Sequence, residues 1–302
     1  MILELPEEEQ ILKETLRRLA LDLPERPASI TTLYSILEEM GLWSLNLSVD
    51  AGGSEMNHRC AAIAIEEIAR QNTSLATTLA VRLGLTNQAF SRNPESPKLP
   101  GQGPGAAILL TRPSGKASLI WPSETYCYAP QEGTFVEKPS PLSGEKPSTL
   151  LGLTEIPLVD FSLDPLPGNG YSDNVAGPTA FAALNLGIAS RAAEEARRYA
   201  SERTQFRKTL DSFQAIQFKL ADMASQLEAA RWLLYRASSQ EKQSLALAAL
   251  TYSEEIALQI TDEALQVHGG YGYTSEYPVE ALYRDALSTA ALSALLFPRI
   301  SK

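Results

Sequence analysis

Residues 264–286 read ALQVHGGYGYTSEYPVEALYRDA. The glycine and proline residues in this stretch decide where helices are expected to end and begin near the end of the chain. The pair Gly269–Gly270 ends one helical pattern, and another starts behind Pro278. A glycine pair is typical of a helix C-cap, and it also lets a ligand approach bare backbone amides closely. Both readings stay open from these residues alone, and in the second Gln266 adds a side-chain contact.

The residues on both sides of this stretch keep the spacing of helices. Helices are predicted from about Pro178 to Glu202, from about 241 to 268 and from about 279 to 297. Apolar residues of a further helix recur at intervals of three and four, namely Ile216, Leu220, Met223, Leu227, Ala230 and Leu234. That spacing is typical of the buried seam between packed helices. Residues 175–302 are therefore predicted to form a four-helix bundle.

The chain before the bundle has two compositions. Residues 1–90 have helical patterns, and the first, behind Pro6, puts Ile11, Leu12, Thr15, Leu16 and Leu19 on one face at helical spacing. In the next part, 13 of the 19 prolines lie between residues 91 and 170. Such density suits short strands joined by turns. The apolar pieces that would form strands are AAILLT (106–111), SLIWP (118–122), TYCYA (125–129), TFVE (134–137) and TLLGLT (149–154). A disordered linker is the alternative.

These patterns predict a mostly α-helical protein with a small β insert. It comprises an N-terminal α-helical domain (1–90), a reduced Pro/Gly-rich middle β-domain (91–174) and the C-terminal four-helix bundle (175–302). A chain of 302 residues with 44% hydrophobic residues is long enough to bury a sizeable core.

The composition argues against several classes of partner and site. The formal net charge of −10 disfavours non-specific binding to nucleic acid or to an anionic membrane, and no apolar run is long enough to predict a membrane span. Cys60 and Cys127 show no pairing pattern, and neither His58 nor His268 has metal-ligand spacing to them. The acidic start of the sequence differs from a signal or transit peptide. A cytoplasmic protein without a metal site is expected.

Residues 202–214, ERTQFRKTLDSFQ, are a second segment that could bind an anion. Arg203 ends one helical pattern, Phe206 follows it, and Phe213 and Gln214 open the next. One reading is a loop whose exposed arginine is stabilised by the helix dipole. The other is a clamp, in which a guanidinium binds a diphosphate bidentately while an aromatic ring stacks on a purine.

The charged residues near the end of residues 264–286 have a structural interpretation. Glu276, Glu280 and Asp285, with Arg284 beside them, are interpreted as bracing the turn through ion pairs and capping rather than as paired catalytic carboxylates. His268 is interpreted as a packing residue rather than a catalyst.

Together these stretches resemble the acyl-CoA dehydrogenase family. Residues 182–206 (AALNLGIASRAAEEARRYASERTQF) are similar to its long helix and Arg-x-x-Phe-Gly turn, and residues 209–231 (TLDSFQAIQFKLADMASQLEAAR) to the next helix. Residues 265–286 resemble its Gln-x-x-Gly-Gly-x-Gly-Tyr segment and Arg-Asp-Ala motif. Residues 40–54 and 65–74 agree more loosely.

The resemblance implies a fold, a cofactor and an assembly. The fold is an α-helical domain, a β-domain and a four-helix bundle, assembled as a tetramer of two dimers. The cofactor is FAD, shared across a subunit interface. By resemblance, the residues that touch its ADP half are Arg203, Gln205, Phe206, Phe213, Gln214, Gln266, Gly269 and Gly270.

The sequence departs from the family where the chemistry should occur. The family's reaction, α,β-dehydrogenation of an acyl-CoA thioester, needs a carboxylate to remove the α-proton. Ser293 stands where the usual glutamate base is counted, and Gly177 at the alternative position on the long helix. Asp173 is the nearest carboxylate to Gly177 and the candidate for a displaced base. The middle domain lacks strands that cover the flavin, and Arg207 replaces the glycine of the Arg-x-x-Phe-Gly turn.

Three functions follow as hypotheses. In the first, the chain lacks its own base and completes the FAD site of an acyl-CoA dehydrogenase-like partner, in a homo- or hetero-oligomer that acts on acyl-CoA. In the second, it is a self-sufficient FAD enzyme with a displaced base. In the third, it is a non-enzymatic scaffold with a vestigial flavin surface. By resemblance, the electron acceptor is an electron-transferring flavoprotein.

Overall fold

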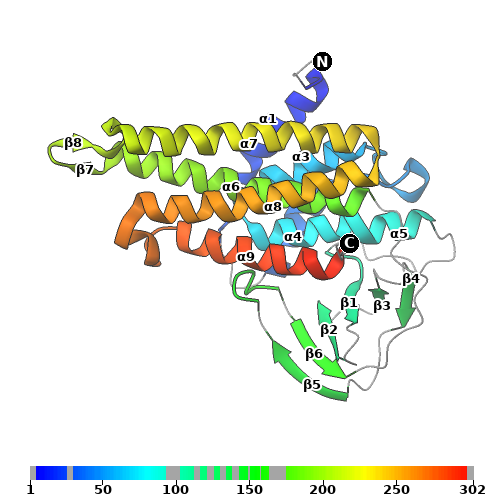
Figure 1. Ribbon diagram of the computed structural model, residues 1–302. Helices are drawn as coiled ribbons and strands as arrows, with labels where there is room; N and C mark the ends of the chain where they lie inside the picture. Colours follow the sequence, from blue (N-terminus) through cyan, green and yellow to red (C-terminus); the bar gives the residue numbers. More distant parts are fainter. Residues whose placement is uncertain are drawn as a thin grey trace.

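A bundle of long helices forms the centre of the molecule, with a layer of shorter helices on one side and a small sheet at one end (Figure 1). The computed structural model describes residues 5–25, 30–92, 103–111, 116–120, 126–129, 134–137, 143–148, 150–156, 158–162 and 175–297. The predicted fold class, mostly α-helical with a small β insert, is confirmed. The domain limits at 90 and 174 stay a prediction.

Four helices form the bundle: α6 (Ala176–Glu202), α7 (Gln214–Gln240), α8 (Gln243–His268) and α9 (Val279–Leu296). Along the predicted seam of α7, the side chains of Met223, Leu227, Ala230 and Leu234 are buried. Residues 176–190 of α6 are buried on all sides because α3, α4, α8 and α9 all pack against this helix. Pro178 lies in the first turn of α6, where its missing N–H leaves no helical hydrogen bond unmade.

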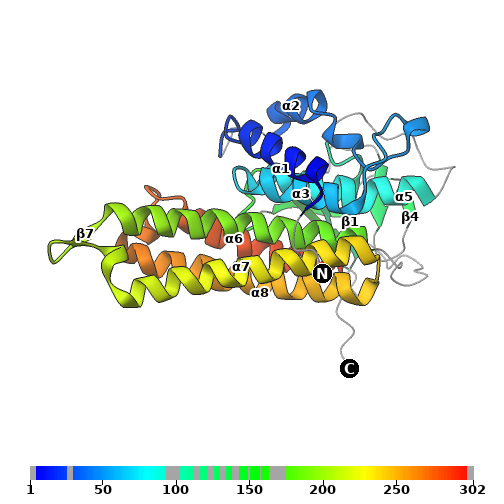
Figure 2. The same ribbon diagram turned by 90° about the horizontal axis from the view of Figure 1, so that it is seen from above.

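The N-terminal helices lie over the bundle as a second layer (Figure 2). They are α1 (Glu7–Ala20), α2 (Tyr34–Glu39), α3 (His58–Ala69), α4 (Thr73–Val81) and α5 (Asn87–Arg92), with 3-10 turns at Ile30–Leu33, Leu42–Ser44 and Val49–Ala51 and a π-helical turn at Arg82–Thr86. The side chains of Asn57 and Asn72 cap α3 and α4, accepting hydrogen bonds from the amides of Cys60 and Leu75. These caps fix where the two most buried helices of the layer begin.

A glycine in α6 brings the two helical layers into close contact. A Cβ atom on Gly187 would lie 2.4 Å from Cβ of Ala69 on α3 and 2.5 Å from the carbonyl oxygen of Glu66. Only glycine therefore fits at this crossing, and the N-terminal layer is packed into the bundle rather than linked loosely to it.

The two neighbouring carboxylates of α3 are buried at the contact between the layers. Glu66 and Glu67 are 0% and 1% exposed. Arg231 of α7 donates from Nε to Glu66 at 2.9 Å, and Arg17 of α1 donates from Nε and Nη2 to Glu67 at 2.9 and 3.0 Å. Buried carboxylates need such partners, so these charges join α1, α3 and α7.

The face of α1 that carries its apolar residues is only partly buried. Leu16 is buried, but Ile11 is 58% exposed and Leu19 is 39% exposed. Glu9 is buried instead, and its carboxylate accepts from Nε of Arg59 at 2.5 Å. The orientation of α1 is set by ion pairs to α3. The spacing of apolar residues in the sequence does not predict such pairs.

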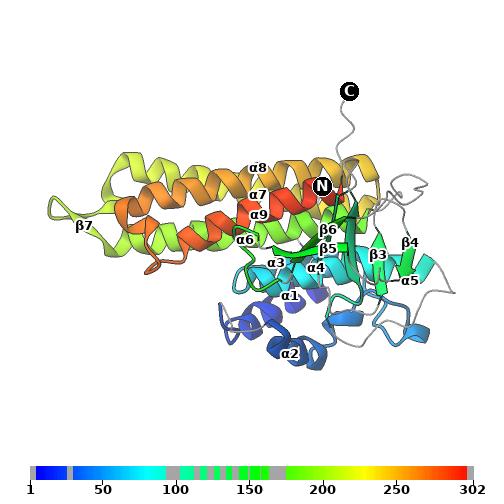
Figure 3. The same ribbon diagram turned by 90° about the horizontal axis from the view of Figure 1, so that it is seen from below.

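The sheet lies at one end of the bundle (Figure 3). Its strands are β1 (Ala107–Thr111), β2 (Lys116–Ile120), β3 (Tyr126–Ala129), β4 (Thr134–Glu137), β5 (Ser143–Ser148) and β6 (Leu158–Ser162), in the order β4-β3-β1-β2-β6-β5. The pair β1–β3 is parallel and the other neighbours are antiparallel. Four of the five apolar pieces form strands, so the reading of this part as short strands is supported.

The fifth piece, TLLGLT (149–154), is not a strand in its described residues 150–154. The amide of Gly152 donates to Oγ of Ser288 at 2.7 Å, and the amide of Leu153 donates to Oδ1 of Asp285 at 3.0 Å. These amides are used by side chains of α9 and are not available to a strand ladder, which corrects the prediction.

Two absences hold for the part of the chain that the structure describes. It contains no group of three His, Cys, Asp or Glu side chains placed to hold a metal ion. None of its helices combines the length and the hydropathy that a membrane span requires.

Candidate cofactor surface and base position

Three helix ends meet at the end of the bundle that lies away from the sheet (Figures 1 and 3). Arg203 is the C-cap residue of α6, Phe213 the N-cap residue of α7, and Gly269 the C-cap residue of α8. The residues that the sequence predicted to bind a cofactor all belong to this end. Those that are exposed are Arg203, Gln205, Phe206, Gln214, Gln266, Gly269 and Gly270, while Phe213 is half-buried. We call them the clamp surface.

A tight hairpin carries one side of the clamp surface. Strand β7 (Thr204–Gln205) pairs antiparallel with β8 (Lys208–Thr209), and Phe206 and Arg207 form the turn with φ values of 52° and 64°. A two-residue turn with both φ values positive is usually built from asparagine and glycine. Here it holds the ring of Phe206 out of the fold, 87% exposed.

The glycine pair carries the other side. Gly269 has φ 61° and ψ −139°, a conformation that favours glycine. Gly270 has no positive φ, and a Cβ atom on either residue would meet nothing within 4 Å. Nothing inside the described fold therefore requires position 270 to be glycine, and the space over its backbone is open to a ligand. The N–H of Gly269 is already donated to the carbonyls of Leu265 and Gln266 of α8. The groups that fit a diphosphate are therefore the Arg203 guanidinium and the exposed backbone at Gly270, since guanidinium and backbone N–H groups are the usual ligands of phosphate oxygens.

An aromatic contact joins the two sides. The guanidinium carbon of Arg203 lies 5.3 Å from the ring centre of Tyr271, directly after the glycine pair. Tyr271 was missed in the sequence, although an aromatic residue next to a glycine pair was the available signal. The contact holds the Arg203 guanidinium against the ring of Tyr271 without neutralising its charge.

His268 is buried directly before the glycine pair and packs beneath the clamp surface. It is 3% exposed, its ring stacks on Tyr199 with centroids 4.3 Å apart, and Nδ1 hydrogen-bonds the Ala264 carbonyl at 2.8 Å. Burial lowers the pKa of His268, which keeps the ring neutral at pH 7. The structure supports its interpretation as a packing residue.

The two positions at which the family resemblance would place a catalytic base, Ser293 and Gly177, are packed inside the protein. Ser293 is 1% exposed within α9 and donates its hydroxyl proton to the carboxylate of Glu254 on α8. At Gly177, a Cβ atom would lie 2.7 Å from Cε1 of Phe297 and 3.1 Å from Cδ2 of Leu85. Asp173, the candidate for a displaced base, lies outside the described residues.

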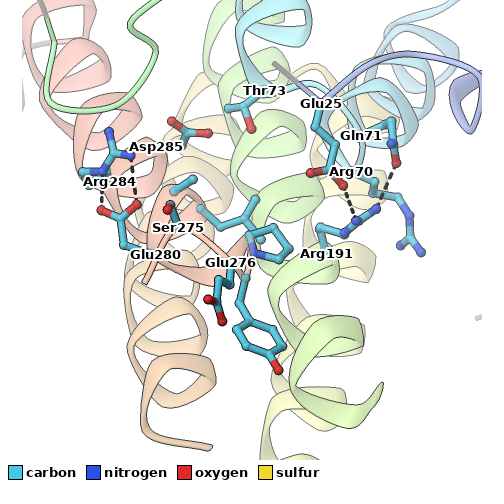
Figure 4. Close-up of a pocket in the computed structure, with 14 residues that line it drawn as sticks. Glu25, Arg70, Gln71, Thr73, Arg191, Ser275, Glu276, Glu280, Arg284 and Asp285 are labelled. Carbon is cyan, nitrogen blue, oxygen red and sulfur yellow. Dashed lines mark hydrogen bonds and ion pairs between the residues drawn. The ribbon is translucent and has the colours of Figure 1, made fainter. Parts of the chain in front are cut away.

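A cavity of about 250 Å³ lies between α6, α9 and the end of α3 (Figure 4). Its arginines are paired: Arg191 with Glu25, and Arg284 with Glu280 through two hydrogen bonds of 2.6 and 2.9 Å. Arg70, at the far side of the cavity, pairs with Glu67 of α3, the helix that it ends, and with Glu194 of α6. The three described arginines that line the cavity are thus all paired, so it offers no unpaired guanidinium to an anion.

The Arg284–Asp285 pair acts as a structural brace. Nη1 of Arg284 donates to the carbonyl of Leu151 at 2.8 Å, beside the bonds from Gly152 and Leu153 to α9. The bracing interpretation holds for Glu280, Arg284 and Asp285, which tie the segment before β6 to the bundle. Glu276 is exposed and takes no described part in it.

Both helical parts of the chain match a known protein family. Family models described as the acyl-CoA dehydrogenase N-terminal and C-terminal domains match residues 6–93 and 178–293. One similar curated protein is the caffeyl-CoA reductase-Etf complex subunit CarC of Acetobacterium woodii, 46% identical over 114 residues, which are 36% of this chain and 30% of that protein. Four relatives that are 42–46% identical to this chain, CarC among them, are matched over less than a third of their own length.

Two further proteins are similar over most of the chain. The "Probable acyl-CoA dehydrogenase fadE25" of Mycobacterium leprae is 27% identical over 359 residues, covering 95% of this chain and 92% of that one. Because that alignment is longer than the chain itself, this chain lacks dozens of residues that the relative has. The acyl-CoA dehydrogenase of Bacillus anthracis, solved in complex with FAD, has the same fold, with a TM-score of 0.72 at 20% identity over 95% of this chain and 64% of that one.

Proposed function

The chain belongs to the acyl-CoA dehydrogenase family, and we propose that it lacks its own base and completes the FAD site of a partner chain in acyl-CoA α,β-dehydrogenation. The single observation that carries the proposal is the clamp surface, where Arg203 is exposed beside Gly270, whose backbone has open space over it.

The roles of the clamp residues follow from their chemistry. The guanidinium of Arg203, with the exposed backbone at Gly270, would bind the diphosphate, and the exposed ring of Phe206 would stack on the adenine. Gln205, Gln214 and Gln266 offer amide donors and acceptors around them. When bound, FAD supplies the acceptor for the hydride from the substrate β-carbon.

The position of the clamp surface supports a site that is shared between chains. The clamp surface lies at one end of the bundle, and the sheet lies along the half of the bundle that is away from it (Figure 1). No described strand of the same chain's sheet is therefore drawn beside the clamp surface. We therefore propose that the flavin ring belongs to the partner.

Two observations support the absence of a base. The hydroxyl of Ser293 is engaged with Glu254, and the space beside Gly177 is filled by Phe297. A base must reach the substrate proton directly or through one water, and neither position offers a carboxylate on an open surface.

The remaining parts of the proposal rest on relatives. Acetobacterium woodii CarC is named as a subunit of a complex with Etf. We propose an electron-transferring flavoprotein as the electron acceptor, and a homo- or hetero-oligomer as the working assembly. The cytoplasmic location expected from the sequence stays a prediction.

The test is to purify the chain alone and co-expressed with a full-length family member, and to quantify flavin in each sample. We expect a colourless chain alone and a yellow complex that oxidises acyl-CoA. Flavin and activity in the chain alone would instead identify a self-sufficient enzyme. A complex whose flavin content is unchanged by Arg203→Ala would exclude the clamp and leave a scaffold.

A further inference from the structure

A second cavity, of about 460 Å³, lies between α1, α6 and α7, and none of the clamp residues lines it. Its volume falls in the range of about 300–1,000 Å³ that is usual for small-molecule sites. Five basic side chains line it in a chain whose formal net charge is −10: Lys13, Arg17, Arg70, Arg197 and Arg231. Such a concentration of cations in an acidic protein needs an explanation.

Four carboxylates in and behind the cavity compensate the charge of four of these five cations. Glu194 and Glu228 line the cavity, and Glu66 and Glu67 lie buried behind it. Arg231 pairs with Glu66 and Glu228, Arg17 with Glu67, and Arg70 with Glu194 and Glu67. Nζ of Lys13 lies 4.0 Å from Glu67 and donates to the hydroxyl of Tyr235 at 3.2 Å. One positive charge is left over.

The excess charge belongs to Arg197. Its side chain is exposed on α6, and it forms no ion pair with any residue that the structure describes. An anion that enters the cavity therefore finds one guanidinium whose donors are not already used, which matches a single negative charge better than a phosphate dianion.

Aliphatic side chains also line the cavity, on the face of α7 that carries Arg231 as well. Leu220, Ala224 and Leu227 line the cavity from one face of α7, at the spacing of three and four residues that places them in a row. Ala193 continues this surface on α6. An unpaired guanidinium and a row of aliphatic side chains in the same cavity suit a ligand with a charged head and a hydrocarbon tail.

We propose that the cavity between α1, α6 and α7 binds a small amphipathic monocarboxylate, with its carboxylate on Arg197 and its alkyl chain along Leu220, Ala224 and Leu227. This site is independent of the clamp surface and of the function proposed above, since it uses no residue of either.

The test is calorimetric titration of the full chain, in its native oligomer, with octanoate. Acetate carries the charge without the tail, and 1-octanol carries the tail without the charge, so both should bind at least tenfold more weakly. Arg197→Gln should weaken octanoate binding about ten- to a hundredfold, because a charge-assisted pair is lost. Ala224→Trp should weaken it by filling the wall.

Arg236→Gln is the matched control, because Arg236 is also exposed, has no ion pair among the described residues and lies on α7 outside the cavity. It should leave octanoate binding unchanged. Octanoate that fails to bind, or that binds Arg197→Gln as tightly as the unaltered chain, would overturn the proposal. Equal binding of inorganic phosphate or of 1-octanol would overturn it as well.

Discussion

Gly270 and Gly272 differ in what a side chain would meet at each position, and this difference separates a ligand contact from a packing contact. A Cβ atom at 270 meets nothing within 4 Å, whereas one at 272 would lie 2.9 Å from the carbonyl oxygen of Leu265. We expect Gly270→Ala to leave the melting temperature unchanged within a few degrees and to lower the flavin content of the partner complex severalfold.

Gly272→Ala is the control, and it should lower the melting temperature of the chain whether or not flavin is present. Absorbance at the flavin band and thermal unfolding of the same preparations check both variants. Full flavin occupancy in Gly270→Ala would mean that the open space over this residue holds no ligand.

Arg207 sits at φ 64°, in the position of the hairpin turn that favours glycine. A left-handed conformation costs a residue with a side chain roughly 1–2 kcal/mol, and glycine avoids this cost. Glycine loses more backbone entropy on folding than other residues, which offsets part of the gain. Arg207→Gly is expected to raise the free energy of unfolding by about 0.5–1 kcal/mol in urea titrations. Arg207→Ala keeps the strain and should give no gain, so equal stabilisation by both variants would contradict the explanation.

His268 should make the fold sensitive to mild acid. Burial lowers its pKa in the folded protein, so below about pH 6.5 the unfolded chain binds the proton more tightly and stability falls as the pH decreases. The same sign applies to His58, whose pKa burial also lowers. We expect the melting temperature to fall between pH 7.5 and 5.5, and to fall less in His268→Phe, which keeps an aromatic ring on Tyr199. An identical pH profile in both proteins would exclude this role.

At the scale of elements, α9 holds the segment before β6 through side chains rather than through strand pairing. Asp285 accepts from the amide of Leu153, which has φ 49° and is fully buried. Asp285→Ala would leave that amide unpaired, at a cost of about 1–3 kcal/mol. We expect faster limited proteolysis of the middle part of the chain in this variant.

Glu280→Gln serves as a comparison, because it weakens the Arg284 pair on the surface of α9 but leaves the bond from Leu153 in place. It should be cleaved at nearly the rate of the unaltered chain. Cleavage of Asp285→Ala at that same rate would show that the segment does not depend on the bond.

The elements also show how far the sequence could predict the molecule. The four bundle helices and four of the strand pieces were predictable, because periodicity and proline density depend on local residue order. The orientation of α1 was not, since it depends on Glu9 and Arg17 meeting charges of α3 about 50 residues away. The clamp residues were located by motif, but the open space at Gly270 and the contact of Tyr271 with Arg203 required the structure.

At the scale of the whole molecule, buried ion pairs connect the N-terminal layer to the bundle. Burial alone would raise the pKa of Glu66, but Arg231 and Lys13 outweigh it and hold that pKa below its usual value. Stability from Glu66 is therefore present above about pH 4.5 and lost as the pH falls through the lowered pKa. Removing a single partner would leave a charge buried without compensation.

We expect Arg231→Met to lower the free energy of unfolding by about 3–5 kcal/mol, the cost of leaving one member of a buried pair. The double variant Glu66→Gln with Arg231→Met should recover more than half of that loss, because no unpaired charge remains. Denaturant titrations of the two proteins check this, and a double variant no more stable than Arg231→Met would show that the charges of this pair are not coupled.

The bond between Ser293 and Glu254 limits what a single substitution at position 293 can achieve. A glutamate at position 293 would set two acidic groups against each other inside the buried core, where both cannot carry charge at once. Installing a carboxylate there by one substitution would therefore be costly, and a functional base at this position would need a second change at Glu254.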